Sequence, residues 1–256
     1  MKLTIVAPNR DRLDFTQPAS RLFLKSIQWQ DCLNFNLLLV DGGSKNYDEL
    51  KSYIQCYDQK IPVHMIQYKL GKDFNKPILD NFGIRNAKTE YIMTTDVDIV
   101  FAPQFVSELI KLLEPNVMVE SRAMYWYNNN AESIYKSDKN QYNIEELRVG
   151  VIKKRTTCGA CQCMHHKSWE RIRGFDEQYY GWGSEDYDLY YRARLSGLKA
   201  KWMGESLDSI MVFHQPHFKS NEQIREDLKT QEVNKRRLAN VRSFVVNPNG
   251  WGGIYE

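Results

Sequence analysis

The chain has 256 residues, of which 42% are hydrophobic and 26% are charged, a balance that excludes an intrinsically disordered protein. The length fits one large α/β domain or two small ones. The formal net charge of +3 is small, and the Lys and Arg residues are spread along the whole chain, which argues against nucleic-acid binding.

Three features of the sequence favour a cytoplasmic protein. No stretch approaches the roughly 20 apolar residues of a membrane span. The N-terminus enters a strand pattern at once, at Leu3, with no signal peptide before it. The five cysteines are an odd number, which favours reduced thiols over a disulfide framework.

The first hundred residues alternate between strand and helix patterns. Short apolar runs bounded by turn residues predict strands, and the segments between them predict helices. The predicted strands are Leu3–Ala7, Phe35–Val40, Val63–Tyr68 and Tyr91–Thr95, and the predicted helices are Pro18–Gln28, Asp48–Tyr57 and Lys76–Ala87. This alternation is typical of an α/β fold with a mostly parallel central sheet flanked by helices.

The remainder of the chain is less regular. A helix is predicted at Pro103–Leu113, a strand at Val117–Glu120 and a charged helix at Ser220–Arg242. Between these elements, Ala123–Leu147 is polar, rich in Asn, Tyr and Ser, and without a clear period. We predict a long irregular loop there, a kind of segment that is usually functional or mobile in a compact domain.

Two carboxylates interrupt the apolar run Tyr91–Phe101. Asp96 and Asp98 follow a pattern typical of a buried parallel strand, where an acid needs a partner or a metal ion. Open α/β sheets bind ligands at the carboxyl ends of their strands. Residues one apart point to opposite sides of an extended chain, so we expect one acid to hold a divalent cation while the other faces a neighbouring group. The alternative is that both acids merely begin a turn.

The loops after the first two strands also carry polar groups. Arg10 and Arg12 follow the first strand, and the fixed N–H geometry of arginine suits a phosphate or a planar base. An ordinary solvated loop is the alternative. Asp41 follows the second strand and precedes Gly42 and Gly43, which let a ligand approach the backbone.

The segment Cys158–His166 contains cysteines and histidines that could bind zinc. No second Cys/His pair follows at the distance found in zinc fingers, and the residues alternate as in a strand. A redox-active cysteine pair is disfavoured, because no helix begins directly after Cys158 to lower its pKa. We predict a strand together with a loop.

A second informative stretch is Gly174–Asp188. Ser184 is placed to cap a helix over Leu189–Leu195, and the acids Glu185 and Asp186 would complement the positive end of that helix. Helix capping therefore explains the acids of this stretch.

Capping does not explain a tryptophan between two glycines. Gly181 and Gly183 indicate a mobile turn, and Trp182 offers a flat apolar face that suits a sugar ring. Asp186 follows closely and is a candidate general base.

Five motifs, in this order, resemble those of the GT-A glycosyltransferases, and within that fold those of the β-1,4-galactosyltransferase and chondroitin-synthase type (families 2 and 7). The family motifs P-F-R-x-R, F-N-R…N-x-G, D-V-D, G-W-G-G-E-D and M-x-x-H correspond here to Pro8–Arg12, Phe74–Gly83, Asp96–Asp98, Gly181–Asp186 and Met211–His214. The chain departs from the family at Asn9, Lys76 and Ser184, which replace an aromatic residue, an arginine and a glycine.

The resemblance implies a role for each matching residue. A uridine diphosphate site would be lined by Pro8, Arg10, Arg12, Phe74 and Lys76, with Asp41 near the uracil, and Asp96 and Val97 near the ribose and donor sugar. Mn²⁺ or Mg²⁺ would be bound by Asp98, His214 and Met211, of which the thioether is a poor match for Mn²⁺; His217 is a rival to His214. Trp182, Gly183 and Glu185 would contact the substrate sugars, and Asp186 would be the catalytic base.

The resemblance also implies an activity and a domain organisation. The protein would be an inverting, metal-dependent glycosyltransferase that moves a galactose- or N-acetylhexosamine-type sugar from a UDP-sugar to a hydroxyl of a saccharide or lipid-linked glycan. Residues 1–217 would form one GT-A domain, with a nucleotide-binding half (1–101) and an acceptor-binding half (102–217). Residues 218–256 would form a helical extension and tail.

Alternatives stay open on the sequence alone. One is a GT-A-like subunit that binds nucleotide-sugars or glycans without turnover, although Asp98, Asp186 and a metal-type histidine favour an enzyme. A nucleotidyltransferase would need a glycine-rich phosphate loop after the first strand, and Pro8–Phe15 contains no glycine. In the tail, Lys235–Arg237 is either a solvated helix face or a peripheral contact with an anionic membrane, and Trp251 is a candidate to pack over the site.

Overall fold

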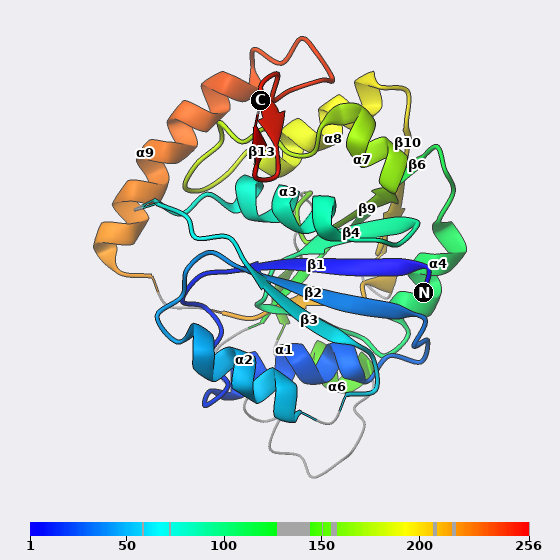
Figure 1. The fold of residues 1–256 in the computed structure, drawn as a ribbon. Helices are drawn as coiled ribbons and strands as arrows, with labels where there is room; N and C mark the ends of the chain where they lie inside the picture. The colour runs from blue at the N-terminus through cyan, green and yellow to red at the C-terminus, as the bar shows by residue number, and fades with distance from the viewer. Residues whose placement is uncertain are drawn as a thin grey trace.

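The fold is built on a seven-stranded sheet with the strand order β10-β6-β9-β4-β1-β2-β3 (Figure 1). This computed structural model describes residues 1–57, 59–71, 73–126, 144–149, 151–154, 158–206, 209–216 and 219–255. The strands are β1 (Leu3–Asn9), β2 (Phe35–Asp41), β3 (Val63–Gln67), β4 (Tyr91–Thr95), β6 (Val117–Ser121), β9 (Cys161–His165) and β10 (Lys199–Met203). Neighbouring strands are parallel except where β9 pairs with β4 and β6. The predicted mostly parallel α/β sheet is confirmed.

Helices cover both faces of this sheet (Figure 1). One face packs against α1 (Pro18–Gln28), α2 (Tyr47–Cys56) and α4 (Phe105–Leu112). The other face packs against α3 (Lys76–Asn86), α7 (His166–Ile172) and α8 (Glu185–Leu195). Because side chains alternate along a strand, neighbouring residues of β1 enter different cores: Ile5 belongs to the first and Val6 to the second.

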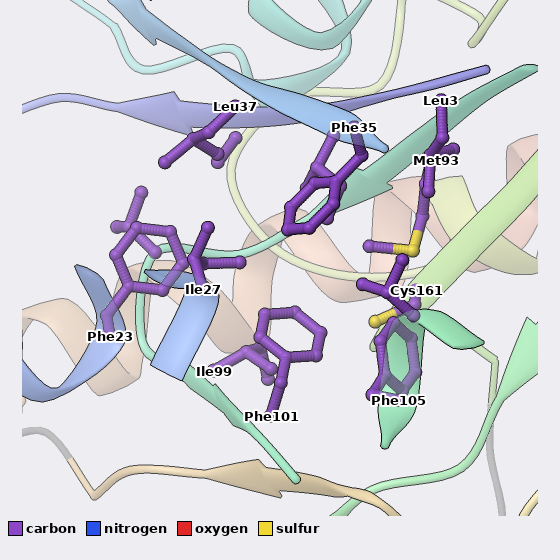
Figure 2. Packing of buried hydrophobic residues seen from close by; sticks show 14 of the residues in the cluster. Leu3, Phe23, Ile27, Phe35, Leu37, Met93, Ile99, Phe101, Phe105 and Cys161 are labelled. Atoms are coloured by element: carbon purple, nitrogen blue, oxygen red, sulfur yellow. The ribbon is translucent and has the colours of Figure 1, made fainter. Parts of the chain in front are cut away.

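Figure 2 shows the first of these cores. Phe23 and Ile27 of α1 lie below Phe35 and Leu37 of β2, and all four side chains are fully buried. Burying a side chain of this size contributes roughly 1.5–3 kcal/mol. The contact of apolar strands with apolar helix faces is therefore the main stabilisation of this half of the molecule.

The predicted strand near Cys158 is confirmed as β9. Cys161 and Cys163 are buried in the first core, and burial raises the pKa of both thiols. A thiol in that state is inert. The single cluster with metal-ligand spacing among the described residues contains no cysteine, so the zinc alternative is not supported.

A second, four-stranded sheet has the order β5-β11-β7-β8. It comprises β5 (Ile99–Phe101), β7 (Met124–Trp126), β8 (Val151–Lys154) and β11 (Val212–His214). The prediction of an irregular loop at Ala123–Leu147 is wrong at both ends, where β7 and α6 (Ile144–Arg148) lie. Elements this short show no measurable period in the sequence. Residues 127–143 are outside the described ranges.

Helix α3 lies directly on β1 and β2. A Cβ atom at Gly83 would overlap Val6 Cγ1 and lie 2.8 Å from Val40 Cγ2, so this approach requires glycine. The helix begins with a cap, because the Asn75 side chain accepts a hydrogen bond from the Ile78 N–H at 3.0 Å. Close packing and capping together fix the position of Lys76, the first residue of α3.

The C-terminal part of the chain packs against this domain. Helix α9 (Asn221–Leu238) begins with a capping box made by Ser220 and Gln223, and it lies on the side of the molecule away from the N-terminus (Figure 1). Among the described residues, no helix is both long and apolar enough to cross a membrane.

A hairpin of β12 (Gly250–Trp251) and β13 (Ile254–Tyr255) ends the described chain. Trp251 is buried in the second core, and the Arg85 guanidinium lies 5.2 Å from the centre of its ring. The expectation that Trp251 packs over the predicted site is therefore wrong, because its ring is used in the packing of α3.

Candidate active site

A cavity of about 320 Å³ lies at the carboxyl ends of β1 and β4. The start of α3, the turn after β4, the end of β11 and the start of α8 form its walls. Its lining residues are Pro8, Arg12, Phe74, Lys76, Asp96, Val97, Asp98, Tyr125, Gly181, Trp182, Glu185, Asp186, His214 and Lys219. Ligand sites of open α/β sheets occur at this edge.

Both acids of the Asp96–Asp98 pair face the same cavity. The expectation that they point to opposite sides is wrong, because the extended chain stops at Thr95 and a turn through Val97 and Asp98 separates β4 from β5. The Ile99 N–H donates to the Asp96 carbonyl across this turn, at 3.4 Å. The turn brings the two carboxylates to one side, where a single ion can contact both.

His214 completes a cluster of metal-type ligands with Asp96 and Asp98. One ligand atom from each of the three lies within 4.8 Å of the others, and His214 Nε2 is 3.6 Å from Asp98 Oδ1. Strand pairing explains the placement: β11 runs antiparallel to β5 with His214 opposite Ile99, and the Gln215 N–H donates to the Asp98 carbonyl at 2.9 Å. Carboxylate oxygens with an imidazole nitrogen suit a divalent cation such as Mn²⁺.

Lys76 connects this cluster to a second group of acids. Its Nζ lies 2.9 Å from Asp96 Oδ1 and 3.8 Å from Asp186 Oδ1. Burial by itself lowers the pKa of the ammonium, but the surrounding carboxylates, Asp186 and Asp96 foremost, raise the pKa well above its ordinary value. Lys76 is therefore a permanent positive charge between the two halves of the cavity.

Two of the acids near Lys76 have raised pKa values. Burial, and after it the charge of Asp186, raises the pKa of Glu185 from 4.5 to about 7. Asp80, one turn further along α3, is fully buried, and burial raises its pKa well above the ordinary value. Neither Asp80 oxygen has a hydrogen-bond partner among the described residues. Because burial disfavours a charged carboxyl and like charges in a confined space repel one another, the carboxyl groups of Glu185 and Asp80 retain their protons to higher pH, which keeps the net charge of the cavity low.

The first turn of helix α8 forms part of the cavity wall. Ser184 occupies the N-cap position, but its side chain makes no capping hydrogen bond, so the predicted capping role of the hydroxyl is wrong. Its φ of 76° lies in the left-handed region, where the family motif has glycine. Glu185 and Asp186 lie in the first turn of the helix, at the positive end of its dipole.

Asp186 is held from the side of β9. Asp186 Oδ2 occupies the place that a side chain at Gly159 would take, and Gly159 itself has a φ of 112°. Gln162 Nε2 donates both to the Asp186 carbonyl at 3.2 Å and to Glu120 Oε1 at 3.0 Å. Glycine at position 159 is therefore needed for its backbone conformation and for the space that the carboxylate fills.

Some predicted site residues do not line the cavity. Asp41 is fully buried, and its carboxylate accepts hydrogen bonds from the N–H groups of Gly43 and Ser44 and from Asn9 and Gln67. It stabilises the loop after β2, and Asn9, which replaces the aromatic of the family motif, is one of its partners. This arrangement leaves Asp41 no exposed surface for contact with the uracil ring of a nucleotide.

Arg10, Gly183 and Met211 also lie outside the lining. Arg10 Nη1 donates to the Asp73 carbonyl at 3.3 Å. The half-buried Met211 side chain packs against two hydrophobic clusters, and its carbonyl accepts from the Ala102 N–H. His217, the predicted rival of His214, is outside the described residues.

The cavity includes residues that the sequence did not suggest. The ring of Tyr125 lies 4.8 Å from that of His214, because β7 and β11 pair at these two residues. Lys219 Nζ lies 5.2 Å from the centre of the Trp182 ring. No spacing rule signals either residue, since each belongs to a different element from its partner.

A mostly parallel α/β sheet with an acidic, cation-compatible cavity at its carboxyl edge is the arrangement expected of a GT-A glycosyltransferase. The chain belongs to glycosyl transferase family 2, whose sequence model matches residues 8–173. A second model, described as the N-terminal domain of galactosyltransferase, matches residues 149–216. The glycosyltransferase family that the motifs indicate is thus confirmed.

Two relatives are polysaccharide synthases of Pasteurella multocida. The chain is 28% identical over 232 residues to the chondroitin synthase of strain Pm70, and 25% identical over 227 residues to a hyaluronan synthase. Each match covers 75% of this chain but only 23% and 22% of the two relatives. The chain therefore spans less than a quarter of their length.

Solved structures share the fold at low sequence identity. The mannosyltransferase PcManGT from Pyrobaculum calidifontis, in complex with GDP-Man and Mn²⁺, has a TM-score of 0.62 at 14% identity and covers 94% of this chain and 65% of its own. TarS 1-349 from S. aureus, in complex with UDP, has a TM-score of 0.58 at 15% identity and covers 91% and 65%. These similarities confirm the GT-A fold.

Gly159→Ala should destabilise the protein more than Gly197→Ala. Both glycines have positive φ, of 112° and 93°, so both variants carry backbone strain. The methyl group at position 159 also collides with Asp186, and this overpacking should cost about 1–3 kcal/mol more. The methyl group at position 197 collides with nothing, because no atom lies within 4 Å of the Cβ position there. Urea unfolding of both variants measures the difference. Equal losses would show that the Asp186 carboxylate is not confined by Gly159.

Glu185→Gln should stabilise the protein more at pH 8 than at pH 5. A carboxyl whose folded-state pKa lies near 7, against 4.5 ordinarily, binds its proton more tightly when folded. The wild type therefore loses stability as the pH rises from about 4.5 to 7, by on the order of 1–3 kcal/mol. The glutamine variant does not lose this stability. Thermal unfolding across this range, without added metal, tests it against Glu222→Gln, an exposed acid in the first turn of α9. A pH-independent difference for Glu185→Gln contradicts the expectation.

Proposed function

We propose that the protein is an inverting, metal-dependent glycosyltransferase that moves a sugar from a UDP-sugar to a hydroxyl of a glycan acceptor by direct displacement. One observation carries this proposal: a single cavity holds both a metal-type cluster and a separate carboxylate, Asp186, with Lys76 between them at 2.9 Å and 3.8 Å. Such an arrangement separates leaving-group stabilisation from proton removal.

Asp98, His214 and Asp96 would hold the cation. Their two carboxylates and one imidazole fit Mn²⁺ well, and Mg²⁺ less well because it prefers oxygen ligands. Met211 is left out of the ligand set because its side chain packs in the hydrophobic clusters. When bound, the cation supplies Lewis-acid stabilisation of the charge that develops on the leaving diphosphate.

The donor would bind at the end of β1 and the start of α3. Pro8, Phe74 and Val97 give this part of the cavity an apolar surface, and Arg12 adds a guanidinium at its exposed rim. The Phe74 ring is 39% exposed, which leaves a face for a nucleotide base or ribose. UDP and UDP-GlcNAc are the ligands in the TarS complexes. Together with the synthase relatives, they support a donor of the galactose or N-acetylhexosamine type.

Asp186 would act as the general base. Asp186 lines the cavity from α8, with Lys76 between it and Asp96, and it would take a proton from an acceptor hydroxyl that attacks opposite to the leaving group. A single displacement of this kind inverts the anomeric centre. Glu185, with its raised pKa, would bind the acceptor hydroxyls, and the exposed ring of Trp182 would cover the sugars and exclude water.

The acceptor would be a saccharide or a lipid-linked glycan, bound by residues of the 102–217 half, with the nucleotide in the 1–101 half. A peripheral contact with an anionic membrane would use Lys235 and Arg236 of α9. Arg237, the third basic residue of that run, is committed elsewhere, because Nη2 forms an ion pair with Asp176 Oδ2 at 2.5 Å.

Asp98→Asn should abolish the gain in UDP affinity that Mn²⁺ provides. The amide keeps the shape of the side chain but removes a charged ligand oxygen. Isothermal titration of UDP with and without Mn²⁺ measures this gain, and Asp48→Asn, at an exposed position of α2, is the control. A folded Asp98→Asn protein with unchanged metal dependence would sink the metal assignment.

Asp186→Asn should lower the transfer rate by about 10²–10⁴-fold, the usual cost of losing a general base. The Kd of UDP with Mn²⁺ should stay within about threefold, a change of less than 1 kcal/mol. Glu185→Gln should act mainly through the KM of the acceptor. A screen of UDP-sugars for Mn²⁺-dependent hydrolysis first identifies the donor. The transfer rate and the Kd of UDP are then measured for each variant.

Two results would contradict the role of Asp186. Transfer at the wild-type rate would place the base elsewhere, and loss of UDP binding would make the acid structural. A wild-type protein that binds UDP with Mn²⁺ but neither hydrolyses nor transfers any sugar would support the non-catalytic subunit instead.

A further inference from the structure

Helix α9 contacts the loop of residues 180–183 that carries Trp182. We propose that Thr230 and Asn234 of α9 are positioning residues that hold this loop over the cavity, so that the C-terminal helix is part of the sugar-binding site. The catalytic consequence rests on the glycosyltransferase function proposed above. The contact itself stands on the geometry of the two elements.

The backbone of the loop is bound to α9 through hydrogen bonds. The Trp182 N–H donates to Thr230 Oγ1 at 3.2 Å, and Asn234 Nδ2 donates to the carbonyls of Tyr180 at 3.0 Å and of Trp182 at 3.4 Å. Thr230 Oγ1 in turn donates to the Asp227 carbonyl at 3.1 Å, which fixes the orientation of the hydroxyl. Both peptide groups of Trp182 are thereby bound to the helix.

The loop also touches α9 too closely for any residue but glycine. A Cβ atom at Gly181 would lie 2.7 Å from both Cγ2 and Oγ1 of Thr230. The φ of 67° at Gly181 favours glycine independently. Gly181 is therefore the point where the loop rests on the helix, which limits the mobility that the sequence predicts for this turn.

The tryptophan ring has its own support. Lys219, just before α9, places Nζ 5.2 Å from the centre of the Trp182 ring, and the same Nζ lies 2.6 Å from Asp227 Oδ2. Asp227 thus holds the ammonium against the ring, where cation–π attraction stabilises one ring orientation. The Trp182 side chain is 44% exposed, so a face stays open to the cavity that it lines.

The burial pattern of α9 indicates what the helix is for. The two residues that α9 buries, Thr230 and Asn234, are both polar, whereas a helix that only covers a core buries apolar residues. A buried polar group is costly unless it is hydrogen-bonded, and these two make most of their bonds to the loop. At its other end α9 is anchored by the ion pair of Arg237 with the buried Asp176. The helix is therefore fixed to the domain and fixes the loop in turn.

Thr230→Val removes the hydroxyl with little change in shape, and Thr230→Ser keeps the hydroxyl. Hydrogen exchange measured by mass spectrometry on peptides covering residues 179–184 reports directly on the loop and needs no substrate. Thr230→Val should accelerate exchange of the Trp182 amide by about tenfold, the effect of losing one hydrogen bond. Thr230→Ser should restore the slow exchange. Lys229→Ala, an exposed position on the same helix, should leave exchange unchanged.

Sugar transfer and UDP binding are measured on the same variants. Thr230→Val and Asn234→Ala should lower the turnover number by about tenfold or more, since misplacement of a substrate-covering group weakens alignment. The Kd of UDP with Mn²⁺ should be unchanged, because UDP lacks the donor sugar that Trp182 would cover. Thr230→Ser should recover turnover, and Lys229→Ala should match the wild type. A purely structural role would instead weaken UDP binding together with turnover.

The outcomes separate this proposal from the proposed function. Unchanged exchange of residues 179–184 in both Thr230→Val and Asn234→Ala overturns the contact. Faster exchange with wild-type turnover overturns the positioning role. A wild-type protein that does not bind UDP with Mn²⁺ overturns the proposed function, while the exchange experiment still decides whether α9 holds the loop.

Discussion

The site depends on one positive charge held among carboxylates. Asp96, Asp186, Glu185 and Asp80 all act on the Lys76 ammonium, and the nearest oxygens lie 2.9 Å and 3.8 Å from its Nζ. Without that charge, acids from α3, α8 and the turn after β4 would repel one another in a partly buried space. Its position follows from packing that has no chemical role: Gly83 lets α3 lie on β1, and Asn75 caps the helix at Lys76. The tight contact between α3 and the sheet thus places the positive charge that offsets the repulsion among the carboxylates of the cavity.

The first half of the fold could be predicted because each strand is a short apolar run and each helix lies between two of them. Tyr91–Thr95 and Pro18–Gln28 match the predicted bounds. In the second half, α4, β6 and α9 were also predicted, but the strand pairings were not, because they are non-local and the elements of the second sheet are short. β7 joins β11 across some 90 residues of chain, and β9 enters the sheet antiparallel to both neighbours. No local pattern records such partners.

Residues that line the candidate site were predictable where their chemistry alone marks them. Asp98 and Asp186 stand out as acids beside apolar or aromatic residues, and His214 follows from the motif order. Prediction failed where a residue's partner decides its place. Asp41 looks like a ligand-binding acid, but hydrogen bonds within its own loop occupy it. The rule that neighbouring side chains alternate did not predict the turn at Val97, because that rule applies only to an extended strand. Gly159 carried no signal because the side chain that needs its space comes from Asp186.

The two walls of the cavity differ in how rigidly they are built. Asp98 lies in the turn just before β5, and His214 ends β11, the strand that pairs with β5, so backbone hydrogen bonds set their separation. Trp182 comes from a glycine loop that has no sheet or helix of its own, and its order depends on α9. In the proposed function, a cation would be bound by the first wall, whose geometry is set by the sheet. Alignment of an acceptor would need the second wall as well, and the order of that wall depends on α9. Turnover should therefore be more sensitive than nucleotide affinity to changes outside the cavity, because the weaker wall bears on the reacting sugar alone.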